Sequence, residues 1–119
     1  MRGGVALNQW SRELDGADLV HDGLWVSRAE MVAAKRRMRR DFLRAVSHAA
    51  ENVRRVAEKQ VPREWSLKVE PGVRIAQMLR PIESIGCYIP GGPFALVSTL
   101  VTTVVPALVV RIPRVVAVC

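Results

Sequence analysis

Cysteine, histidine and aromatic residues are scarce in this chain. Two cysteines, Cys87 and Cys119, are too few for a disulfide scaffold and suit a reducing compartment. Only 5% of the residues are aromatic. The two histidines, His21 and His48, lie far apart, with no cysteine or histidine at ligand spacing from either, so the chain alone is not expected to build a zinc site.

Long apolar runs are also lacking. The longest mostly apolar stretch without charge, residues 95–110, is shorter than the roughly 20 residues of a spanning helix and contains serine, threonine and proline. It is therefore predicted to be a buried helix, and no membrane association is expected. The first twenty residues lack the apolar core of a signal peptide. We expect a cytoplasmic protein.

What the chain does have is apolar content and positive charge. It has 119 residues, of which 50% are hydrophobic, and a formal net charge of +7. So apolar a composition excludes a disordered tail, and the length allows one small domain or a piece of a larger one. The positive charge raises nucleic acid or an acidic membrane surface as partners but says nothing about the fold.

Residues 27–60 carry the clearest local signal, that of a helix. Ser27 and Glu30 have the spacing of a capping box, in which each side chain binds a free amide of the first turn. Apolar residues then recur at helical spacings. This stripe consists of Met31, Met38, Phe42, Val46, Ala49, Val53 and Val56. The pattern predicts one long helix, or two with a break near Arg40-Asp41.

The same segment contains the most basic run of the chain, Lys35-Arg36-Arg37-Met38-Arg39-Arg40. One interpretation is a nucleic-acid-binding or interaction fragment built on residues 27–60. Helical geometry favours a solvated face, because most of these arginines lie away from the apolar stripe. No aromatic residues interleave with the charges to stack bases. We therefore expect no nucleic-acid partner.

The rest of the chain reads as strands with one more helix. Residues 65–69 and 73–79, separated by Pro71-Gly72, are predicted to be extended, either as separate strands or as a hairpin. A strand at 84–89, a turn at 90–93, a helix at 96–110 and an apolar strand at 115–118 then predict a βαβ unit. The predicted fold class is α/β, with an N-terminal helical segment leading into a truncated Rossmann-like βαβ unit of a parallel sheet. The expected domains are a helix-rich part, 1–82, and the start of an incomplete Rossmann-like domain, 83–119.

The candidate binding site is the turn Tyr88-Ile89-Pro90-Gly91-Gly92-Pro93. It follows a parallel strand and precedes a helix, which is where open α/β sheets bind ligands. Its glycines allow close backbone approach, and the next helix offers free amides to an anion. Tyr88 would add an aromatic face and a hydroxyl to the same rim. The turn is not the G-x-G-x-x-G phosphate fingerprint.

The chain resembles the amino-terminal part of histidinol dehydrogenase over nearly all of its length. The most specific match is Ile85-Gly86 followed by Tyr88-Ile89-Pro90-Gly91-Gly92. Further matches are Arg2-Gly3-Gly4-Val5-Ala6-Leu7, Leu14-Asp15-Gly16, Val26-Ser27, Asn52-Val53, Gln60, Pro71-Gly72-Val73, Arg80-Pro81-Ile82, Ser98-Thr99 and Val105-Pro106-Ala107. Related dehydrogenases of other alcohols share the loop.

The resemblance implies a zinc- and NAD-dependent enzyme that oxidises L-histidinol to L-histidine, the last step of histidine biosynthesis, as a homodimer. The tyrosine of the family's loop contacts NAD, which makes Tyr88 the expected cofactor-binding residue. The family's zinc ligands, its acid–base pair and most substrate contacts come from sequence that this chain lacks. No catalytic or metal-binding residue is therefore assigned here. We expect a fragment that is inactive by itself.

The chain departs from the family at several positions. An Ala-Gly pair is common in the family where Val110-Arg111 stands here, and a histidine is often found at the position of Ala57. A charged residue in place of that glycine is expected to loosen the turn from the helix into the last strand.

Overall fold

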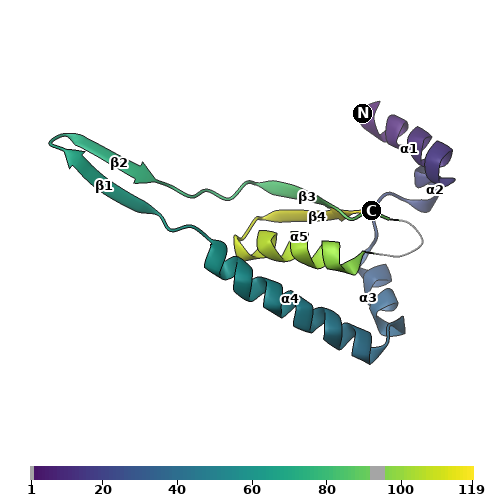
Figure 1. Cartoon of the computed structure of the whole chain (residues 1–119). Helices are drawn as coiled ribbons and strands as arrows, with labels where there is room; N and C mark the ends of the chain where they lie inside the picture. Colours follow the sequence, from purple (N-terminus) through teal and green to yellow (C-terminus); the bar gives the residue numbers. More distant parts are fainter. Residues whose placement is uncertain (1, 92–95) are drawn as a thin grey trace. The chain divides into compact units, whose positions relative to one another are not determined.

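The computed structural model describes residues 2–91 and 96–119 (Figure 1). They form two compact units, Met1–Arg39 and Arg40–Cys119, which are treated separately below. The expected domain limit between residues 82 and 83 remains a prediction, because compactness within this chain does not test the domains of a longer protein. No helix in the described residues is long and apolar enough to cross a membrane.

The first unit contains three helices, α1 (Arg2–Asp15), α2 (Leu19–Asp22) and α3 (Arg28–Arg37). Loops follow Asp15 and Asp22, and each contains a glycine with a positive φ, 66° at Gly16 and 85° at Gly23. Asp18 caps α2 by accepting the amide of Val20 at 3.1 Å. The Arg12 guanidinium donates a hydrogen bond to the Asp18 carboxylate and forms an ion pair with it. This interaction lowers the pKa of Asp18.

The capping box at the start of α3 is confirmed. The Ser27 amide donates to Glu30 Oε2 at 2.7 Å, and the Glu30 amide donates to Ser27 Oγ at 3.2 Å. These hydrogen bonds with Ser27 lower the pKa of Glu30. The cap is therefore complete at neutral pH and is lost as the pH falls through this lowered pKa. Lys35, Arg36 and Arg37 are exposed in the last turn, where positive charge complements the helix dipole.

The second unit begins with α4 (Arg40–Gln60), so residues 27–60 form two helices rather than one. The break falls at Met38, whose backbone is extended with φ −77° and ψ 147°, slightly before the expected position. The predicted apolar stripe is only partly right: Val46 and Val53 are half-buried, but Val56 is 58% exposed. Ala57 is buried instead. The buried face of α4 is thus rotated from the predicted one toward Ala57, because α5 is the only described element that packs against this helix.

A hairpin follows α4, one of the two predicted alternatives. Strands β1 (Trp65–Glu70) and β2 (Val73–Gln77) are antiparallel, with Leu67 opposite Ile75 and a bulge between Lys68 and Glu70. In the connecting turn, Pro71 precedes Gly72, which has a φ of 84°. This is the residue pattern of a type II turn, in which the third residue needs a positive φ.

The remainder is the predicted βαβ unit. Strand β3 (Ser84–Tyr88), helix α5 (Val97–Val109) and strand β4 (Arg114–Val118) follow one another, and β3 pairs with β4 in parallel from Ser84 opposite Arg114 to Tyr88 opposite Val118. Helix α5 contacts both strands and α4, so it lies between the sheet and α4 (Figure 1). The buried residues gather around it: Ala57, Cys87, Ile89, Val101, Val105 and Ala107. The predicted α/β class is confirmed.

Helix α5 ends in a Schellman motif closed by a residue that is not glycine. The Arg111 amide donates to the Leu108 carbonyl at 3.1 Å, and the Ile112 amide donates to the Ala107 carbonyl at 3.1 Å. Arg111 takes the left-handed position with a φ of 57°, the one positive φ among the non-glycine residues described. The family's glycine at this position would have no such strain.

Replacing this arginine by glycine should therefore strengthen the end of α5. For Arg111→Gly we expect a gain of about 1 kcal/mol, seen as roughly fivefold slower hydrogen exchange at the Ile112 amide. Arg111→Ala is the matched control, because it removes the guanidinium but keeps the Cβ that causes the strain. Slower exchange in both variants would mean that the side-chain charge, not the backbone, weakens this turn.

Candidate functional site

Tyr88 lies where the expected site was placed, at the carboxyl end of the parallel pair. Its neighbours Cys87 and Ile89 are 3% and 8% exposed, whereas the tyrosine is 68% exposed. Since strand residues alternate between faces, Tyr88 lies on the face opposite the one that these two residues bury. The Ile89 amide donates to the Val118 carbonyl at 2.7 Å and so continues the pairing just past the tyrosine. Strand pairing therefore fixes the backbone at Tyr88, while the side chain of the tyrosine is exposed to solvent.

The backbone after Tyr88 leads to the start of α5. Pro90 is half-buried, and Gly91 is exposed with no atom within 4 Å of a Cβ built on it. Gly92 and Pro93, also part of the predicted turn, lie outside the described residues. The N-cap of α5 is Leu96, which makes no side-chain capping bond. The Leu96 side chain thus caps none of the first amides of α5, and these amides can donate hydrogen bonds to an anionic group.

The histidines and the buried cysteine do not form a reactive set. His48 Nε2 lies 3.2 Å from Asn52 Nδ2 on an exposed part of α4. Cys87 is buried, and His21 belongs to the other unit. Among residues 2–91 and 96–119, no three His, Cys, Asp or Glu side chains are grouped so that they could hold a metal ion. The residues described therefore do not fit a zinc centre.

A groove between α4 and α5 was not predicted from the sequence. It has a volume of about 350 Å³. Its lining consists of Asn52, Val53, Val56, Ala57 and Gln60 from α4, with Thr102 and Pro106 from α5. The only sign of this groove in the sequence is that several of its lining positions match the family. The lining contains no charged group, so the groove offers surface for packing and no acid or base.

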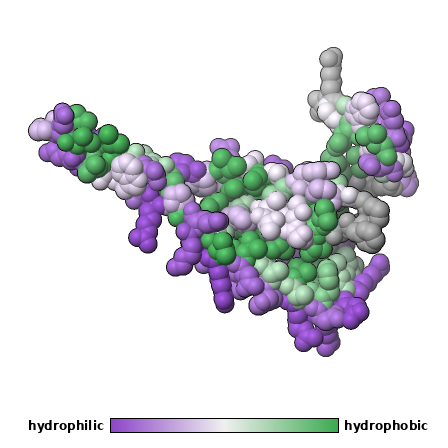
Figure 2. Space-filling view, in the orientation of Figure 1, coloured by the Kyte–Doolittle hydropathy of each residue, from purple (hydrophilic) through white to green (hydrophobic). Residues whose placement is uncertain are grey.

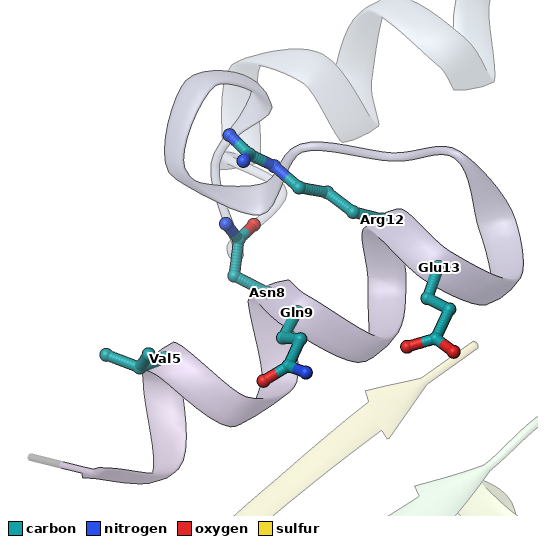
Figure 3. Close-up of a pocket in the computed structure, with 5 residues that line it drawn as sticks. All are labelled: Val5, Asn8, Gln9, Arg12 and Glu13. Carbon is teal, nitrogen blue, oxygen red and sulfur yellow. The ribbon is translucent and has the colours of Figure 1, made fainter.

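A second hollow runs along α1 and is no better candidate (Figure 3). It is lined by Val5, Asn8, Gln9, Arg12 and Glu13, all from one helix. The polar groups that point toward α2 already have partners, because Arg12 pairs with Asp18 and Asn8 Oδ1 accepts the Val20 amide at 3.2 Å. Within the described residues, the edge at Tyr88 is therefore the best-supported site.

Comparison with known proteins shows the family of this chain. The sequence profile of histidinol dehydrogenase matches residues 1–119. The histidinol dehydrogenase of Methanothermobacter thermautotrophicus is 36% identical over 114 residues, which are 96% of this chain and 26% of that protein. Histidinol dehydrogenase homolog 2 of Mesorhizobium japonicum is 35% identical over 114 residues, 95% of this chain and 26% of that protein.

A solved structure is similar over the same extent. The crystal structure of histidinol dehydrogenase from Elizabethkingia anophelis superposes with a TM-score of 0.85 at 29% identity, covering 94% of this chain and 25% of that one. This chain thus spans about a quarter of the length of the relatives it matches. Because the family profile extends over the whole sequence, the chain belongs to the histidinol dehydrogenase family.

Proposed function

We propose that this chain supplies the tyrosine-bearing wall of the NAD site in a histidinol dehydrogenase, an oxidoreductase that converts L-histidinol to L-histidine. The observation that carries the proposal is the exposed Tyr88 ring at the carboxyl edge of a parallel pair. In the family the tyrosine of this loop contacts NAD, and such an edge is where α/β sheets bind nucleotides.

The residues at this edge fit a dinucleotide in shape and charge. Tyr88 offers an aromatic face, Gly91 allows close backbone approach, and the first amides of α5 can bind an anionic group such as a phosphate. When bound, NAD supplies the hydride acceptor. The part assigned to this chain is to bind and orient the cofactor.

The remaining chemistry is assigned to sequence beyond this chain. The described residues do not fit a zinc centre, so we assign them no part in chemistry at the metal. Since the chain spans about a quarter of its relatives, we propose that the zinc ligands, the acid–base pair and most contacts to L-histidinol belong to the other three quarters. The isolated chain should then be inactive, and the complete enzyme should be a homodimer.

Two further assignments go with this proposal. Free thiols at Cys87 and Cys119 suit the reducing cytoplasm, where we place the enzyme. The alternative, a basic nucleic-acid-binding fragment built on residues 27–60, is not favoured, because the family match includes this segment and its exposed basic run is interrupted by the break between α3 and α4.

The proposal is tested in a hybrid enzyme, in which residues 1–119 replace the matching quarter of the Methanothermobacter thermautotrophicus protein. Tyr88→Ala should weaken NAD binding about tenfold or more, because about 1.4 kcal/mol or more of aromatic contact is lost on the cofactor side only. Binding of L-histidinol should change less than about twofold. Calorimetric titration with each ligand separately measures both effects.

Tyr88→Phe is the matched control for this experiment. It keeps the ring and removes only the hydroxyl, so it should retain most of the NAD affinity if stacking dominates. Equal losses for NAD and L-histidinol in Tyr88→Ala would contradict the assignment and indicate general damage to the site.

A further inference from the structure

The β1–β2 hairpin has an apolar face that no other element of the described chain covers. Strands β1 and β2 contact only each other among the elements described. Leu67 pairs with Ile75 across the two strands, and Trp65 and Val73 share their face by the strand period of two. These four side chains, here called the hairpin face, are 48–59% exposed. Apolar side chains gather over this hairpin in the space-filling view (Figure 2).

The opposite face has a different character. The next cross-strand pairs are Ser66 with Ala76 and Lys68 with Arg74, and all four residues are exposed. The Arg74 guanidinium also lies 3.5 Å from Ser66 Oγ. One side of the hairpin is thus polar and suited to water, whereas the other is suited to burial. A two-stranded hairpin is marginally stable alone, so covering the hairpin face would also stabilise it.

The base of the hairpin is fastened by its own side chains. Glu64 Oε1 accepts the Leu79 amide at 2.9 Å and a nitrogen of Arg80 at 3.2 Å. Gln77 Nε2 donates to the Arg63 carbonyl at 3.1 Å. These bonds hold the two strands together at their open end. The hairpin is therefore held in place before any partner is added, which lowers the entropic cost of docking.

At least part of the hairpin has a counterpart in the solved relative, which is a much longer chain. The superposition includes 94% of the chain, and the remaining 6% of 119 residues is about seven. The hairpin, residues 65–77, is longer than that, so at least part of it has its counterpart in the relative. That relative is about four times as long as this chain, since the match covers 25% of it.

We propose that the hairpin face is a docking surface for the other three quarters of the histidinol dehydrogenase polypeptide. This inference rests on the proposed function in one respect, namely that the chain works as part of a longer enzyme. It does not depend on where NAD binds. Trp65, Leu67 and Ile75 would be the apolar anchors, and the polar pairs Ser66–Ala76 and Lys68–Arg74 would stay in water.

Thiol labelling of the hybrid enzyme tests this proposal without any ligand. Leu67→Cys places a thiol on the hairpin face, and Ser66→Cys places one on the polar face, both in a Cys119→Ser background. Both thiols lie in the tryptic peptide of residues 64–68, so mass spectrometry distinguishes them from other cysteines. In the hybrid, the Leu67→Cys thiol should react at least about tenfold more slowly than the Ser66→Cys thiol, because only the hairpin face would be covered.

The buried thiol of Cys87 reports folding in the same sample, and only molecules in which it stays unlabelled are compared. If Leu67→Cys does not fold, the pair Ile75→Cys and Ala76→Cys gives the same comparison on β2. Equal rates on both faces of the hybrid would overturn the proposal. So would protection of Leu67→Cys that is lost when the hybrid enzyme is diluted until its subunits separate, because the partner subunit would then cover the face. A loss of NAD binding with the labelling pattern intact would contradict only the proposed function.

Discussion

The isolated 119-residue chain should be largely helical, should associate, and should show no cooperative thermal transition. The described core contains only small or medium side chains, and none of them is less than 2% exposed. Burial of this extent cannot offset the conformational entropy of 119 ordered residues. The β3–β4 sheet has two strands, and a parallel sheet is normally covered on both faces.

Association is expected because the apolar surface is large and the strand edges are open. Many large apolar side chains are exposed, among them Trp10, Trp25, Trp65 and Leu67. Unpaired strand edges add backbone groups that can pair with another chain. Helices such as α3, with its capping box, should persist as fluctuating structure, because their hydrogen bonds are local.

Circular dichroism during heating, with light scattering at several concentrations, measures both properties. The hybrid enzyme is the control and should melt cooperatively, because its remaining three quarters can cover these surfaces. A sharp two-state melt from a monomer of the isolated chain would show that residues 1–119 close a core of their own. The proposal that the chain is one part of a larger folding unit would then be wrong.

Val105→Asp should destabilise the hybrid enzyme more than any other substitution discussed above. Val105 is 7% exposed on α5, the helix that contacts α4 and both strands of the parallel pair. An unpaired carboxylate at this position should cost about 3–5 kcal/mol of unfolding free energy. Burial removes the water that would hydrate the charge, and the substitution brings no basic partner to compensate for that loss. Denaturant unfolding of the hybrid enzyme measures this loss.

Thr102→Asp is the matched control, three residues before Val105 on α5, where the side chain is exposed although it also lines the groove between α4 and α5. There the same charge should stay hydrated, and the cost should be within about 0.5 kcal/mol. Comparable losses at both positions would mean that the packing of α5 does not hold this unit together.

Much of the local structure could be predicted from the sequence, because its causes are local. Ser27 and Glu30 satisfy each other's amides whatever surrounds them, and Gly72 meets a turn geometry that few other residues adopt. The parallel strand that ends at Tyr88 and the helix that follows it were predictable for the same reason, since apolar runs marked both elements. The position of the candidate site followed from that order of elements.

Features that depend on packing were predicted less well. Neither glycine nor proline marks the break at Met38, so the sequence left one helix or two open. The prediction that Val56 is buried assumed that every apolar residue of the stripe faces the core. In the structure, α5 covers α4 on the side of Ala57. The groove lined by Asn52 and Thr102 joins two helices far apart in the chain, and no local pattern reports such a contact.

The sequence by itself therefore determined the helix caps, the turns, the order of strands and helices, and the family resemblance through the loop after Tyr88. These depend on neighbouring residues, whose preferences act whether or not the chain is folded. Only the tertiary structure decided which face of α4 is buried, that Arg111 takes a left-handed backbone conformation, and that the hairpin face has no cover within the described chain. Each of these depends on which distant element lies alongside, because burial is a property of the assembled chain rather than of any one segment.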